Sequence, residues 1–155
     1  MDDALTPRRA ARVLVLDETD RILLFHCFDP GRPDHTYWIT PGGGIEAGET
    51  AAAGAARELA EETGLRVRPA KLGEPVWREV IEFPFNGRWY RQEQEFFMIR
   101  APRWEVDTTG LDEVERGSTD GHRWWTRQEL DQTADRYYPS KLPELLSRIT
   151  KGTPC

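Results

Sequence analysis

Short apolar runs separated by polar turns dominate the N-terminal part of the chain. Residues 13–16 and 21–27 are rich in apolar and β-branched side chains, and the polar segment 17–20 between them predicts a hairpin. Residues 29–34 are dense in turn formers and predict a loop. Residues 36–39 predict a further short strand. The ordered part of the chain is therefore expected to begin with strands.

A helical pattern follows between Thr50 and Thr63. Small and apolar residues recur there at helical spacing, namely Ala52, Ala55, Ala56, Leu59 and Thr63. They form a narrow face that can lie closely against a sheet, and Gly64 is expected to end the helix. The preceding segment, residues 40–44, is too rich in glycine for regular structure to be expected.

The middle of the chain returns to a strand pattern. Residues 76–83 and 89–99 predict two strands, and Asn86-Gly87 between them is a strong hairpin signal. Pro84 suggests that the outgoing strand ends or bulges there, because proline cannot donate to a sheet ladder.

The last third of the chain begins with a polar segment, residues 107–121, which predicts a long loop of a length that is usually functional or mobile. Residues 123–125 predict a final strand, Thr126 begins a capping-box pattern, and Ser140 can cap a helix over 141–149. Strands interleaved with an early and a late helix predict an α/β fold, with helices on both sides of a mixed sheet.

Composition narrows the classes of function. The 155 residues suit one domain, and the net charge of -6 argues against a nonspecific nucleic-acid binder. No apolar run approaches the roughly 18 residues of a membrane span, and residues 1–3 lack the pattern of a secretory signal. Cys27 and Cys155 require no disulfide. We therefore expect a soluble, cytoplasmic protein without a DNA or membrane partner.

Three carboxylates share one face of the predicted helix. Glu58, Glu61 and Glu62 lie within about one turn, and Arg57 is the sole basic residue between Gly43 and Leu65. Like charges at this spacing destabilise a helix unless a cation offsets them. Hard oxygen ligands suit Mg²⁺ or Mn²⁺, and Mg²⁺ commonly bridges carboxylates and phosphates, so the expected substrate is a phosphate compound.

A run of glutamates on a helix can also be a plain solvated face, but the spacing here is specific. The motif G-x5-E-x7-R-E-U-x-E-E-x-G-U, with U an aliphatic residue, is matched by Gly43, Glu49, Arg57, Glu58, Leu59, Glu61, Glu62, Gly64 and Leu65. This is the Nudix box, and residues 38–44 and 123–130 also resemble that family. The sequence therefore resembles a Nudix hydrolase.

The resemblance implies a Nudix-type α/β/α sandwich around a mixed sheet, with residues 9–150 as a single domain, 1–8 as a flexible arm and 151–155 as a tail. It implies divalent-cation-dependent hydrolysis of a nucleoside diphosphate linked to another moiety. The expected substrate is a small nucleotide such as a nucleoside triphosphate, including oxidised forms. Alternatives are ADP-ribose or a nucleotide sugar, the 5′ end of RNA, and a non-catalytic nucleotide-sensing module. Many relatives dimerise, which favours a homodimer without locating its interface.

Carried onto this box, the resemblance implies Glu58 and Glu62 as the firmest metal ligands, Glu61 as a ligand or base, and the Gly42 carbonyl as a further ligand. Arg57 is expected to orient the glutamates through ion pairs rather than contact substrate.

The residue that activates water is left open among Glu61, Glu93, Glu95, Glu113 and Glu115. Glu93 and Glu95 carry equal weight, and Glu95 is taken as the strand candidate. Glu113 and Glu115 are more readily explained as solvated loop charges.

The predicted substrate-binding residues are Gly43, Glu49, Tyr37 and Arg12. Glycine allows close approach of the backbone, Tyr37 offers a stacking surface, and Arg12 offers a charge for phosphate. For each large aromatic residue, packing in the core is the more common alternative.

Overall fold

Eight strands form one mixed sheet in the computed structural model, which describes residues 5–151. The strands are β1 (Thr6–Leu16), β2 (Ile22–Asp29), β3 (Arg32–Ile39), β4 (Gly42–Gly44), β5 (Trp77–Phe85), β6 (Arg88–Arg100), β7 (Thr119–Trp125) and β8 (Tyr137–Tyr138). The order is β5-β6-β1-β2-β3-β8, with β4 beside β1 and β7 beside β2. The β1–β6 and β3–β8 pairs are parallel and the others antiparallel, so the predicted mixed sheet is confirmed.

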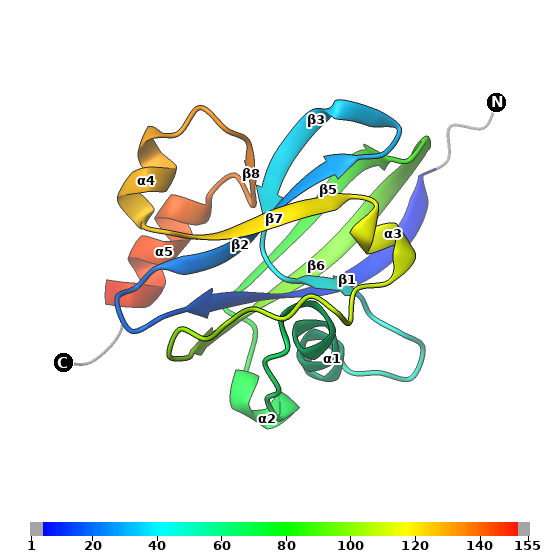
Figure 1. Cartoon of the computed structure of the whole chain (residues 1–155). Coiled ribbons are helices and arrows are strands. Elements are labelled where there is room, and N and C mark those ends of the chain that lie inside the picture. Colours follow the sequence, from blue (N-terminus) through cyan, green and yellow to red (C-terminus); the bar gives the residue numbers. More distant parts are fainter. Residues whose placement is uncertain (1–4, 152–155) are drawn as a thin grey trace.

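Helices cover both faces of this sheet. They are α1 (Ala51–Thr63), α2 (Pro69–Leu72), α3 (Glu113–Arg116), α4 (Arg127–Gln132) and α5 (Leu142–Lys151). Val13 of β1 packs with Leu59 of α1, whereas the next residue, Leu14, packs with Leu146 of α5. Alternation along the strand therefore serves two cores, and Figure 1 shows α1 and α2 on one side and α4 and α5 on the other. The predicted α/β/α sandwich is confirmed.

Local signals define helix α1 as predicted. The Thr50 side chain accepts a hydrogen bond from the Ala53 N–H, and Gly64 adopts a left-handed conformation with φ of 79° while donating to the Ala60 carbonyl. The predicted hairpin turn is confirmed as well, because Asn86 and Gly87 both have positive φ and join β5 to β6. Pro84, however, does not end its strand but stays paired with Trp89. β5 is an edge strand, where a missing N–H can face outward.

Three segments are more regular than their sequences suggest. Residues 6–8, placed in the predicted arm, begin β1 and pair with residues 90–92 of β6. The predicted loop 29–34 shrinks to a tight turn at Pro30-Gly31 between β2 and β3. The glycine segment, expected to be irregular, forms β4 against β1. The remainder of the arm at 1–4 and of the tail at 152–155 lies outside the described residues.

The predicted long loop 107–121 also contains regular structure. Asp112 caps α3 through a reciprocal capping box with Glu115, and β7 begins at Thr119 rather than at residue 123. The capping box predicted at Thr126 is confirmed at the start of α4. Within residues 5–151, every helix falls short of the length and apolarity that crossing a membrane requires.

Candidate active site

Three glutamates from two elements meet beside β4. Glu58 and Glu62 lie one turn apart on α1, Glu115 lies on α3, and one carboxylate oxygen from each is within 4.8 Å of the others. Glu58 and Glu62 are each only 8% exposed. We call Glu58, Glu62 and Glu115 the carboxylate cluster. Such a group of oxygen donors can hold a divalent cation.

The glycines of β4 allow the cluster to approach the backbone. The Gly42 N–H donates to Glu62 Oε1 at 2.7 Å. A Cβ on Gly43 would lie 2.8 Å from the Glu58 carboxyl carbon, and a Cβ on Gly42 would lie 2.4 Å from the Ala11 carbonyl oxygen. Side chains at either position would displace β4 or the glutamates, so these glycines are a steric requirement of the site.

Burial and mutual repulsion dominate the electrostatics of the cluster, although Arg57 pairs with Glu58 and the charge of Arg12 acts on Glu62. Burial, reinforced by the negative charge of Glu115, raises the pKa of Glu58 to about 7. Burial and the charge of Glu58 raise the pKa of Glu62 well above its ordinary value. In the described part of the chain, the buried Glu58 Oε2 has no hydrogen-bond partner. An orphaned carboxylate oxygen among repelling carboxylates fits Mg²⁺ or Mn²⁺, both hard cations that prefer oxygen.

Arg57 organises the outer side of the same helix. Its Nε donates to Glu49 Oε2 at 2.8 Å, and its terminal nitrogens donate to Glu58 Oε1, Glu61 Oε1 and the Gly44 carbonyl at 2.9 to 3.2 Å. Hydrogen bonds to the carboxylates raise the pKa of Arg57, and the bond from Arg57 lowers the pKa of Glu49. Glu61, 41% exposed, is therefore paired with Arg57 and lies outside the cluster.

Glu95, the strand candidate for the base, is not a member of the carboxylate cluster. Arg78 Nε of β5 donates to Glu95 Oε1 at 2.9 Å, and Glu93 is exposed on the same strand. Glu115 takes the place beside Glu58 and Glu62 instead. The sequence contained a signal for the short helix that carries Glu115, because the Asp112-x-x-Glu115 spacing is that of a capping box.

Arg12 and Tyr37 lie on the sheet rather than in the cluster. Arg12 donates from a terminal nitrogen to the Thr40 carbonyl at 3.0 Å and from Nε to Gln94 at 3.4 Å, which ties β1 to the segment entering β4. Burial lowers the pKa of Arg12 and raises that of Tyr37, which packs edge-on against Tyr138.

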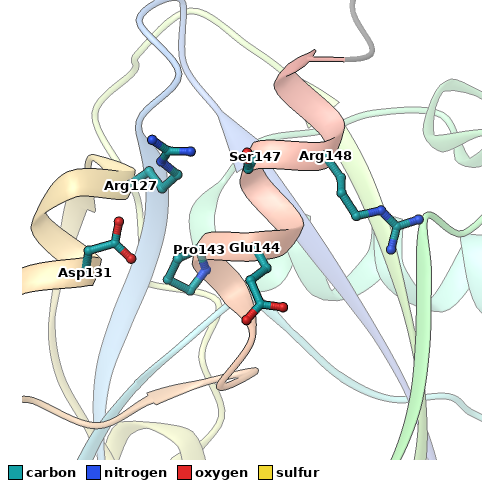
Figure 2. Close-up of a pocket in the computed structure, with 6 residues that line it drawn as sticks. All are labelled: Arg127, Asp131, Pro143, Glu144, Ser147 and Arg148. Carbon is teal, nitrogen blue, oxygen red and sulfur yellow. The ribbon is translucent and has the colours of Figure 1, made fainter.

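The positions of two hollows on the described surface can be compared with that of the cluster. One, of about 490 Å³, adjoins α1 and borders the helix that carries most of the cluster; it is lined by Arg57, Glu61, Arg66, Asp107, Thr109 and Gly110 among others. The other, of about 450 Å³, is a groove between α4 and α5 lined by Arg127, Asp131, Pro143, Glu144, Ser147 and Arg148 (Figure 2). Neither hollow is lined by a residue of the cluster, but the first includes Arg57, which donates to Glu58 Oε1, so the first hollow is the one relevant to the site.

Buried carboxylates beside a glycine-rich strand in an α/β sandwich are a donor set that could hold a divalent cation. The NUDIX domain model matches residues 6–145. The chain therefore belongs to the Nudix hydrolase family, as its box predicts.

Comparisons with individual proteins agree with membership of this family. An RNA pyrophosphohydrolase from Dinoroseobacter shibae is 33% identical over 105 residues, which span 63% of this chain and 64% of that relative, slightly under two thirds. An RNA pyrophosphohydrolase from Wolbachia pipientis is 28% identical over 94% of this chain and 93% of its own length. The MutT protein from Methanosarcina mazei has a similar fold, with a TM-score of 0.67 and 16% identity over 95% of each chain.

Proposed function

We propose that this protein is a divalent-cation-dependent pyrophosphohydrolase that cleaves the diphosphate of a small nucleotide, such as a nucleoside triphosphate or its oxidised form. The observation that carries the proposal is the carboxylate cluster with its orphaned, buried Glu58 Oε2. A metal-binding donor set in an α/β sandwich of this family suits phosphoric anhydride hydrolysis.

Glu58, Glu62 and the Gly42 carbonyl would hold the cation in this proposal, and Mg²⁺ or Mn²⁺ would neutralise the diphosphate and lower the pKa of water. Glu115 would take the proton from the attacking water, since it comes from a separate element and reaches the cluster from outside α1. It replaces Glu95, which Arg78 engages. Glu61 is the second candidate for this proton.

The hollow beside α1 is the proposed entry for the phosphates. Arg57 and Arg66 bring positive charge to its lining beside Glu61 and Asp107, and Gly43 would support the site by leaving room for the Glu58 carboxylate against the backbone. Glu49 would act indirectly by holding Arg57. Arg12 and Tyr37 would support the segment that enters β4 and the sheet beside it.

The 5′-triphosphate end of RNA is the second candidate substrate. Its support is the similarity to two bacterial RNA pyrophosphohydrolases, one matched over almost the whole chain. The net charge of -6 favours the small nucleotide, since a long RNA needs compensating positive charge.

A substrate panel with Mg²⁺ tests the proposal. Nucleoside triphosphates, 8-oxo-dGTP, ADP-ribose, a nucleotide sugar and a 5′-triphosphorylated RNA would be incubated separately, with products identified by mass spectrometry. Pyrophosphate or phosphate release from a triphosphate is expected, and Glu62→Gln should abolish it. Glu18→Gln, on the exposed β1–β2 turn, is the matched control and should leave turnover unchanged.

Each outcome separates the alternatives. If only the RNA is hydrolysed, the proposed substrate is wrong and the 5′-triphosphate end of RNA takes its place. If only ADP-ribose or only the nucleotide sugar is hydrolysed, that compound becomes the substrate in place of the nucleoside triphosphate. Nucleotide binding without turnover, with Mg²⁺ and with Mn²⁺, would overturn the enzymatic proposal in favour of a sensing module.

A further inference from the structure

Strand β5 forms one end of the sheet order and, among the described residues, pairs with β6 alone. Its other side presents unpaired backbone N–H and C=O groups. An edge of this kind is a template for another strand, and proteins normally blunt it with prolines or charges. The arrangement of the proline and the charges on β5 decides whether this edge repels or accepts a partner.

The usable edge runs from Trp77 to Phe83. Phe85 and Arg88 flank the two-residue turn and exchange backbone bonds, so the even-numbered residues of β5 direct their backbone groups outward. Pro84 lacks an N–H and closes the edge on one side. On the other side, the Val76 N–H is already used by the Phe96 carbonyl. The open segment is therefore seven residues long, and its centre is residue 80.

This segment is complementary to itself. When two copies are laid antiparallel about Val80, Arg78 lies opposite Glu82 on both sides of the axis, Trp77 lies opposite Phe83, and Glu79 lies opposite Ile81. Arg78 is paired with Glu95 of its own chain at 2.9 Å, so in the assembly it would lie between that carboxylate and the Glu82 carboxylate of the other copy. Opposite charges facing each other across strands are stabilising. Val80 lies opposite its own copy, and it is 49% exposed, one of three large hydrophobic side chains exposed in the described part of the chain.

Other registers are less favourable. An axis at Arg78, Glu79 or Glu82 would place that charge opposite its own copy, which is destabilising. An axis at Ile81 would bring Pro84, which has no N–H, opposite Arg78. The central valine avoids both problems, so the charges select one pairing.

We propose that two copies of this chain associate through their β5 edges, antiparallel and with the two-fold axis at Val80, so that the sheet continues from one copy into the other. The interface is isologous, which closes the assembly at two chains. This inference is independent of the substrate, and it commits to a second copy of the chain as the partner.

Charge reversal with complementation tests the proposal. Arg78→Glu and Glu82→Arg each place like charges opposite in a homodimer, so each variant alone should be a monomer of about 17.9 kDa where the unaltered chain has twice that mass. An equimolar mixture of the two variants restores both opposite-charge pairs and should regain the doubled mass. Sedimentation of the full chain measures this, and Glu18→Arg on the β1–β2 turn is the matched charge reversal that should stay dimeric.

The complementation separates the interface from folding defects, since two misfolded variants would not restore each other. A monomeric unaltered chain at tens of micromolar would overturn the proposal. So would a dimer that both single variants retain, because the interface would then lie elsewhere.

Discussion

The glutamates around helix α1 fall into two regions with opposite electrostatics. Glu49 and Glu61 receive hydrogen bonds from Arg57, which lower the pKa of Glu49. One turn away, Glu58 and Glu62 are buried beside each other, and their pKa values are raised. Arg57 thus favours the ionised form of Glu49, whereas burial pushes Glu58 and Glu62 toward protonation.

The difference explains which glutamates are free to bind a cation. Arg57 engages both oxygens of Glu49, whereas in the carboxylate cluster it engages only one oxygen of Glu58, and the charge of Arg12 acts on Glu62. Glu58 belongs to both regions, because Oε1 accepts from Arg57 while Oε2 has no partner among the described residues. Arg57 therefore aims one oxygen of Glu58 and leaves the other for a ligand.

The largest expected effect is a difference in kcat/KM between a variant in the carboxylate cluster and a variant on the Arg57 side of the helix. Glu62→Gln should lower kcat/KM with the accepted nucleotide by at least about 100-fold, because even indirect metal partners cost 10- to 100-fold when removed. Glu61→Gln, on the Arg57 side, should cost less than about tenfold. Steady-state kinetics at saturating Mg²⁺ measure both, and an equal loss in the two variants would erase the distinction.

The second prediction concerns stability against pH without a divalent cation. A carboxyl whose pKa is about 7 in the folded chain and 4.5 when unfolded binds its proton more tightly when folded. The free energy of unfolding should therefore fall as pH rises from about 4.5 to 7, and Glu58 contributes roughly 3 kcal/mol of that fall.

Denaturant titrations across this pH range, in excess chelator, measure the effect. Glu58→Gln should flatten the slope and be the more stable protein at pH 8. Adding Mg²⁺ at pH 8 should stabilise the unaltered chain more than the variant. A slope that Glu58→Gln leaves intact would show that Glu58 is not the group being titrated.

Arg57→Lys should have the third largest effect. A lysine ammonium cannot reproduce the fork that contacts three glutamates and the Gly44 carbonyl. Turnover should fall by about 10- to 100-fold, with a matching rise in the Mg²⁺ concentration needed for half-maximal rate. Arg21→Lys, on an exposed turn residue, is the control. A stability loss without a change in Mg²⁺ dependence would contradict a positioning role.

The smallest predicted effect tests the steric requirement at β4. Gly43→Ala should push the Glu58 carboxylate aside, lowering turnover by about tenfold and stability by about 1 to 3 kcal/mol. Gly121→Ala meets open space on β7 and should change stability by no more than about 0.5 kcal/mol. Activity assays and thermal melts measure both variants. If Gly43→Ala and Gly121→Ala behave alike, the close contact between residue 43 and Glu58 does not constrain the site.

Local sequence signals were sufficient to predict the elements whose hydrogen bonds join residues only a few positions apart. The Thr50 cap, the Gly64 stop and the Asn86-Gly87 turn each depend on neighbours along the chain, and all were predictable. The box spacing likewise placed Glu58 and Glu62 on one helix face, because the helical repeat alone determines which side chains are adjacent.

Tertiary pairing decided the remainder. Residues 6–8 and the glycines of β4 carry no strand pattern, and they are strands because β6 and β1 supply their hydrogen-bond partners. Glu115 sits in the cluster because β7 pairs with β2 and the Phe28 N–H binds the Ser118 carbonyl, which hold α3 beside α1. Contacts between residues this far apart in sequence depend on how whole strands pair, and a local pattern does not encode that choice.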